Sequence, residues 1–234
     1  MFNLKEKFEF LEDGIDFPFY NNKPKLSTGE WAILAIAVIL FTLLTYMPWI
    51  LPHYRFLLYF LIMFIPAIYI CKGNYGLFFK KPKLRDIKTI ILCVIGYIIY
   101  GAIISIILSR LGHPASADAV LGSGSPLIVI ATTLIQLVGE EFFKIFILLI
   151  VMYVVYKFTN ERDLTIRVGI IITLLIFGLA HIGAYGNILQ VLLIQGLGTI
   201  FNLYAYMKTK NVVVSYIVHA LIDLYGSIPY FIMH

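Results

Sequence analysis

The chain has 234 residues, of which 61% are hydrophobic and 13% are charged, and its mean hydropathy is +0.92. Soluble domains contain about 25% charged residues, so this composition excludes an ordinary soluble protein and indicates an integral membrane protein. The formal net charge is +5, but the basic residues gather in the connections between apolar stretches. There they set the orientation in the membrane, and we expect no nucleic-acid partner.

Residues 1–30 precede the apolar stretches and form a cytoplasmic N-terminal segment in our interpretation. The segment has many charges and no continuous apolar core of the signal-peptide type. Apolar side chains recur in it at helical spacing, at Leu4, Phe8, Leu11 and Ile15. This pattern favours a short helix on the membrane surface over Met1–Phe19, with a tail lacking fixed structure as the alternative.

Seven apolar stretches are long enough to cross a bilayer as helices, since a span needs about 17–25 apolar residues. They are Trp31–Trp49, Tyr54–Cys71, Thr89–Leu108, Leu127–Tyr156, Val168–Tyr185, Ile188–Met207 and Val212–Ile232. We therefore predict an all-α polytopic membrane protein whose helix bundle occupies residues 31–234.

Lys and Arg are distributed unequally between the two ends of these predicted spans. Fifteen of them lie in the N-terminal segment and in the second, fourth and sixth connections, and the alternate connections carry only Arg55 and Arg110. Positive charge is retained on the cytoplasmic side, so the N-terminus is predicted inside and the C-terminus outside. The basic end of the bundle also suits contact with membrane lipid.

The fourth apolar stretch contains three ionisable side chains, Glu140, Glu141 and Lys144. Glu140 and Lys144 are four residues apart and share a helix face. A charge at the centre of a membrane helix costs about 2.5–3.5 kcal/mol on insertion scales, so this stripe must face other helices or a water-filled pocket. Two carboxylates against one cation leave a negative charge unmatched, which a purely structural clamp does not require.

Further polar side chains recur at helical spacing in the last three predicted spans. Thr173, Phe177 and His181 share one face, and Gln195, Thr199, Asn202 and Tyr206 share another. The last span carries Ser215, His219, Asp223 and Ser227 as a column at i, i+4 spacing. Carboxylates with two imidazoles provide a base for water and donors for an oxyanion, so the combination favours hydrolytic catalysis.

The ordered motifs Glu140-Glu141-x-x-Lys144, Phe177-x-x-x-His181 and His219-x-x-x-Asp223 resemble those of the CPBP family, also called Abi. Its members are intramembrane proteases related to the type II CAAX prenyl endopeptidase. The resemblance covers about residues 125–232, which would form the catalytic core. Two positions depart from the family's usual pattern, since Lys144 stands where the first motif usually ends in arginine and Asp223 stands where the third commonly ends in asparagine.

The resemblance implies roles for these residues. Glu140 and His181 would activate water for attack on a peptide bond, and His219 with Asp223 would stabilise the oxyanion. Glu141 would act beside Glu140, with Lys144 and Phe177 in support. No cofactor is expected on this mechanism.

Two alternatives stay open at this stage. Glu140, His181 and His219 are also candidate ligands for a catalytic zinc ion, because two imidazoles and a carboxylate match one known ligand set. A non-catalytic membrane protein, such as a bacteriocin-immunity or scaffolding factor, would instead use the same polar core to bind a partner.

The substrate class follows from the membrane setting and the resemblance. We expect a peptide or protein in or at the membrane, such as a bacteriocin or signalling-peptide precursor that needs maturation. Frequent Lys, Ile and Asn are typical of a low-GC bacterium, so a bacterial plasma membrane is the expected location.

The charge distribution generates a prediction about topology. A reporter fused after His234 should lie outside the cell, and one fused near Asn160 should lie in the cytoplasm. Accessibility labelling of the two fusions in intact cells measures this, and a cytoplasmic C-terminus would remove one span from the predicted seven.

Overall fold

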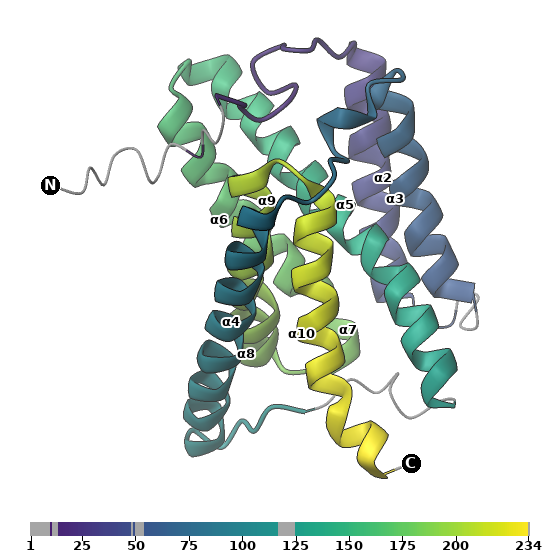
Figure 1. Cartoon of the computed structure of the whole chain (residues 1–234), viewed down its shortest axis with the longest axis vertical. Coiled ribbons are helices and arrows are strands. Elements are labelled where there is room, and N and C mark those ends of the chain that lie inside the picture. The colour runs from purple at the N-terminus through teal and green to yellow at the C-terminus, as the bar shows by residue number, and fades with distance from the viewer. Residues whose placement is uncertain (1–9, 11–13, 48, 50–53, 117–124, 234) are drawn as a thin grey trace, which may run out of the picture.

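The computed structural model describes residues 10, 14–47, 49, 54–116 and 125–233, with side chains described as far as Ser227. The regular elements in these residues are helical (Figure 1). In chain order they are α2 (Thr28–Tyr46), α3 (Arg55–Cys71), η2 (Tyr75–Leu77), α4 (Leu84–Arg110), α5 (Pro126–Thr159), α6 (Arg162–Ala180), α7 (Ile182–Tyr185), α8 (Ile188–Gln190), η4 (Val191–Gly196), η5 (Leu197–Thr199), α9 (Ile200–Thr209) and α10 (Val212–Met233).

Five helical segments of the described chain are long and apolar enough to cross a membrane. They are Thr28–Tyr46, Leu84–Arg110, Pro126–Thr159, Arg162–Tyr185 and Ile188–Thr209. Two shorter apolar helices accompany them, Arg55–Cys71 and the described part of α10, Val212–Ser227. The predicted all-α, multi-pass membrane architecture is therefore confirmed, whereas the count of seven spans and the orientation stay predictions.

Helix α5 occupies the centre of the bundle, where it packs against α2, α3, α6 and α10. Every residue from Gly139 to Leu149 is buried. Aromatic side chains fill the contacts, and the ring of Phe143 stacks on that of Phe41 with centroids 4.3 Å apart. Since apolar surface surrounds α5 on all sides of this stretch, its three ionisable side chains face protein rather than lipid.

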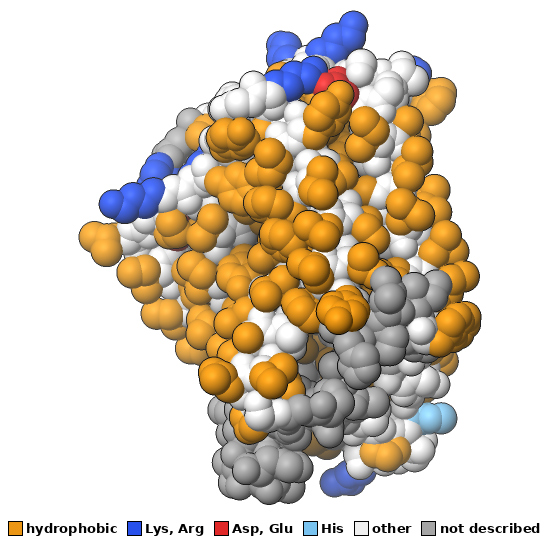
Figure 2. Space-filling model, turned by 90° about the vertical axis from the view of Figure 1, so that its right-hand side faces the viewer, with side chains coloured by type: hydrophobic (Ala, Val, Ile, Leu, Met, Phe, Trp, Pro, Cys, Tyr) orange, Lys and Arg blue, Asp and Glu red, His pale blue; other side chains and the backbone are white. Residues whose placement is uncertain are grey.

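Outward faces of the bundle are apolar over most of their height. One face is covered by hydrophobic side chains, and most of the Lys and Arg side chains in that view lie at one end (Figure 2). Such a distribution suits a hydrocarbon environment around the middle and a charged interface at the basic end.

The sixth apolar stretch departs from the single regular helix that its sequence predicts. A π-helical turn, η4, and a 3₁₀ turn, η5, separate α8 from α9. The backbone of η4 lies very close to α6, since a Cβ atom on Gly178 would stand 2.6 Å from the carbonyl oxygen of Val191. The irregular turn therefore allows the backbones of α6 and η4 to meet at a glycine. Hydrophobic periodicity in the sequence does not predict such a contact.

The N-terminal segment packs across the basic end of the bundle. Most of the surface helix predicted over Met1–Phe19 lies outside the described residues, and the described part, residues 14–19, contains no helix. Instead, Phe17 is buried, and Asp16 accepts hydrogen bonds from Arg162 of α6 at 2.7 and 3.1 Å. Burial alone would raise the pKa of Asp16, but these bonds and those from Tyr20 and the Phe17 N–H hold it below its ordinary value.

Gly139 generates a stability prediction, because it lies against the backbone of α3. A Cβ atom at this position would stand 2.3 Å from the carbonyl oxygen of Tyr59. Gly139→Ala should therefore push α5 away from α3 and destabilise the protein by about 1–3 kcal/mol, the usual cost of overpacking. Thermal unfolding in detergent measures the loss.

Gly226→Ala is the matched control, since nothing lies within 4 Å of a Cβ atom there in α10. Alanine has the higher helix propensity, so this variant should be neutral or slightly stabilised. Equal unfolding temperatures for the two variants would contradict the close contact between α5 and α3.

Candidate active site

The seven side chains singled out in the sequence lie together in the bundle. Glu140, Glu141 and Lys144 are buried in the middle of α5, and His219 is buried in α10. Phe177 is buried in α6, and His181 is the C-cap residue of that helix. Asp223 follows His219 by one turn of α10. The consecutive helices α5 and α6 therefore meet the more distant α10 at one polar cluster.

His181 is fixed by a hydrogen bond to its own helix. Its Nδ1 lies 2.7 Å from the carbonyl oxygen of Phe177. A carbonyl oxygen only accepts, so Nδ1 carries the proton and donates. In the neutral imidazole, Nε2 is then an acceptor, and it points toward Glu140.

His219 is also held by a hydrogen bond from its Nδ1 atom, in this case to a carboxylate. Its Nδ1 lies 2.7 Å from Oε1 of Glu141, so Nδ1 donates to that oxygen. The Nε2 atom of His219 faces the opposite way, toward Glu140 and Asp223. Each imidazole is therefore anchored through Nδ1 and presents Nε2 to the same space.

Glu140 is the residue on which both imidazoles converge. The Nε2 atoms of His181 and His219 each lie 3.9 Å from Oε2 of Glu140. This separation exceeds a direct hydrogen bond, but it is short enough for one water molecule to bridge. The other oxygen, Oε1, accepts a hydrogen bond of 2.8 Å from Nε2 of Gln136. Glu140 thus has one oxygen held by its own helix and one directed at the imidazoles.

The cation of the cluster pairs with Glu141, although Glu140 is the residue that shares its predicted helix face. Nζ of Lys144 lies 2.5 Å from Oε1 of Glu141, and both side chains are only 1% exposed. The amide oxygen of Asn202 accepts from Nζ at 2.8 Å when the amide nitrogen donates to the carbonyl of Thr199. The unmatched carboxylate is therefore Glu140, and Glu141 belongs to a buried ionic network.

Ser215 completes that network from α10. Its hydroxyl donates to Oε2 of Glu141. Glu141 consequently has hydrogen-bond partners on both oxygens, from Lys144 and His219 on one and from Ser215 on the other. Because a buried carboxylate needs such compensation, this arrangement stabilises its charged form and leaves it poorly placed to act as a base.

Phe177 forms an aromatic wall beside the cluster. Its ring centroid lies 4.7 Å from that of His181 and 6.3 Å from that of His219, and Nζ of Lys144 stands 4.9 Å from it. The ring therefore packs beside both imidazoles and the buried cation, so it limits the rotation of the imidazoles.

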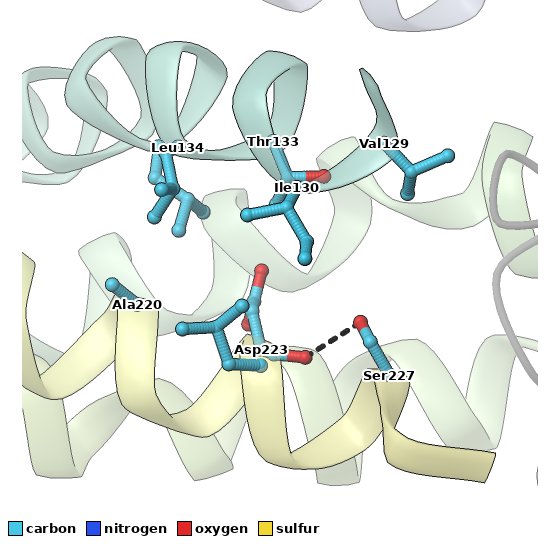
Figure 3. Close-up of a pocket in the computed structure, with 9 residues that line it drawn as sticks. Val129, Ile130, Thr133, Leu134, Ala220, Asp223 and Ser227 are labelled. Carbon is cyan, nitrogen blue, oxygen red and sulfur yellow. Dashed lines mark hydrogen bonds between the residues drawn. The ribbon is translucent and has the colours of Figure 1, made fainter. Parts of the chain in front are cut away.

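Asp223 lies at the opening of the cluster. One of its carboxylate oxygens is 3.8 Å from Nε2 of His219, and its side chain is 35% exposed. It lines a hollow between α5 and α10, where Ile130, Thr133 and Leu134 face Ala220 and Asp223 (Figure 3). The polar cluster is thus adjacent to a mostly apolar opening between two helices.

A family model described as Type II CAAX prenyl endopeptidase Rce1-like matches residues 122–225. These residues form an Rce1-like domain. The match confirms the resemblance to the CPBP family of proteases, and it contains all seven side chains of the polar cluster. Among curated proteins and solved structures, no match to the chain was found.

Three further side chains within residues 122–225 contact the cluster, although their positions in the sequence did not assign them to the site. Gln136, Asn202 and Ser215 contact Glu140, Lys144 and Glu141 respectively. Each lies on a polar stripe at helical spacing, which was the available signal. Which member of each stripe reaches the site depends on helix rotation and crossing, and spacing alone does not define these.

The buried pair of Glu141 and Lys144 generates a second stability prediction. Lys144→Met should be strongly destabilising, because removing one partner of a buried ion pair costs about 3–5 kcal/mol. Glu141→Gln should also destabilise the protein. The double variant should recover a large part of either loss, since it leaves no uncompensated charge, and a double-mutant cycle of thermal unfolding measures the coupling.

Glu161→Gln combined with Lys157→Met is the control, because both side chains are exposed beyond the buried stretch. If the stability losses of Lys144→Met and Glu141→Gln simply add in the double variant, as expected for the control pair, Lys144 and Glu141 are not coupled.

Proposed function

We propose that the protein is an intramembrane endopeptidase that hydrolyses a peptide bond of a membrane-associated peptide or protein, with Glu140 as its base. One observation carries the proposal. Both imidazoles present Nε2 at 3.9 Å from the same carboxylate oxygen, while Glu141, the neighbouring carboxylate, is held in an ion pair. The match of residues 122–225 to a protease family model supports the reaction class.

In the proposed first step, one water molecule donates to Oε2 of Glu140 and to Nε2 of His181. Both atoms are acceptors, so the oxygen lone pairs of the water face the substrate. The water oxygen forms a bond to the carbonyl carbon as its proton passes to Glu140. When the tetrahedral intermediate collapses, the C–N bond breaks and Glu140 returns this proton to the leaving nitrogen.

His219 is proposed to stabilise the oxyanion of that intermediate. Donation from Nε2 requires a proton there as well as on Nδ1, so His219 acts as an imidazolium. Glu141 lies 2.7 Å from Nδ1 and balances the positive charge. Asp223, 3.8 Å from Nε2, supports the same orientation from the opening of the site.

The zinc alternative would use Glu140, His181 and His219 as its ligands. Within the described residues, no group of three His, Cys, Asp or Glu side chains is arranged to hold a metal ion. The side chains as placed do not form a ligand set, so no proposed step passes through a metal. Metal analysis of the purified, active protein tests this directly.

The substrate and the setting are part of the proposal. The mostly apolar lining of the hollow between α5 and α10 beside Asp223 supports a hydrophobic substrate, such as a precursor of a bacteriocin or signalling peptide. We also propose seven membrane crossings in a bacterial plasma membrane, with the basic end of the bundle in the cytoplasm. Successive helices that run in opposite directions support this count (Figure 1).

Glu140→Gln is the decisive variant. It keeps the size and polarity of the side chain but removes the base, so hydrolysis should fall by a factor of about 10²–10⁴. The assay incubates the full chain, purified in detergent, with a panel of hydrophobic peptides and detects new termini by mass spectrometry. Unfolding temperature should change little, because Glu140 is outside the Lys144 ion pair.

Glu161→Gln provides the control, as it makes the same chemical change at an exposed position. Full hydrolysis by Glu140→Gln would exclude Glu140 as the base. Peptide binding that is equal in the wild type and in Glu140→Gln, with no cleavage by either, would instead favour a non-catalytic binding protein.

A further inference from the structure

A second hollow lies at the basic end of the bundle, away from the candidate active site. Four cationic side chains line it, from Lys80, Lys81, Lys83 and Arg85. The remaining lining residues are Ile15, Asp86, Thr209 and Asn211. Among the described residues that line it, Asp86 is the only acidic one, so four cationic side chains stand against one carboxylate there.

The carboxylate of Asp86 is committed to the helix that begins there. It accepts a hydrogen bond of 2.7 Å from the N–H of Lys83, the N-cap residue of α4, and Asp86 is only 6% exposed. This contact stabilises the first turn of α4. One oxygen of this carboxylate is therefore occupied by the helix start and not by the cationic side chains of the hollow.

The segment that carries the cations is fixed to the bundle. The amide of Asn211 accepts from the N–H of Lys80 at 3.2 Å and donates to the carbonyl of Lys80 at 2.8 Å. The N–H of Val212 donates to the carbonyl of Phe78, whose side chain is fully buried. The basic run is thus held in one conformation against the start of α10, so little ordering is needed to bind an anion.

Below the hollow, α4 presents an apolar stripe to the outside. Leu84, Ile87, Ile91 and Ile95 recur at helical spacing and are all exposed. Since α4 is one of the candidate membrane spans, this stripe lies along the hydrocarbon region directly next to the cationic hollow. The combination matches a molecule with an anionic head and an apolar tail.

We propose that this hollow binds the headgroup of an anionic phospholipid, with an acyl chain lying along the apolar stripe of α4. Orientation in the membrane explains an excess of basic residues at this end, but it does not require a hollow, a clamp by Asn211 or a neighbouring apolar stripe. The stripe distinguishes a lipid from free phosphate, which has the same head chemistry. This inference is independent of the proposed protease function.

Binding of short-chain phosphatidylglycerol to the full chain in detergent tests the proposal, with phosphatidylcholine of the same chain length as the neutral-headgroup comparison. Phosphatidylglycerol should bind at least tenfold more tightly, and its binding should weaken as salt is added. The variant K81Q/K83Q/R85Q should lose this preference. The control K25Q/K157Q/R167Q removes three exposed charges outside the hollow and should change affinity by no more than about twofold.

Three results would overturn the proposal. Equal losses in the two triple variants would indicate diffuse attraction to the basic end, and equal affinities for the two lipids would indicate apolar contact alone. Inorganic phosphate that competes as effectively as phosphatidylglycerol would indicate a site for the free anion. The unfolding temperature reports whether the variants fold. The single variant K81Q is a second test, and its affinity for phosphatidylglycerol should be several-fold weaker than that of the wild type.

Discussion

The cost of burying charge in a membrane is the constraint on which this structure depends. Glu140, Glu141 and Lys144 lie in a stretch of α5 that is buried from Gly139 to Leu149. Lys144, His219 and Ser215 compensate Glu141, and they do so from two helices. The packing of α10 against α5 therefore includes ionic contacts as well as apolar ones, and the position of His219 is tied to the stability of the bundle.

The same constraint gives the adjacent carboxylates of Glu140 and Glu141 different roles. Consecutive residues of a helix point about 100° apart, so Glu140 and Glu141 face different neighbours. Glu141 faces its cation, whereas Glu140 has one hydrogen bond from Gln136 and a free edge toward two imidazoles. A carboxylate that is held by Gln136 and has no lysine partner suits a group that takes up and returns a proton.

Much of the architecture and the membership of the polar cluster was predictable from sequence. Apolar stretches predicted the helices, and His219-x-x-x-Asp223 with Phe177-x-x-x-His181 indicated which faces point inward. The pairing of Lys144 was not predictable, because Glu140 at i−4 and Glu141 at i−3 are both within its reach. The π-helical turn at Val191–Gly196 was also missed, since it arises from backbone contact between Gly178 and Gly196 rather than from hydrophobic periodicity.

Gly139 has a consequence beyond close packing. Its Cα faces the backbone of Tyr59 in α3, and any residue with a side chain in that place would be forced out. A rotation of α5 by a single residue would bring Glu140 into this contact and would place Glu141 where Glu140 now faces the imidazoles. The absence of a side chain at Gly139 therefore fixes the rotation of α5 about its own axis. This rotation determines which glutamate faces the imidazoles.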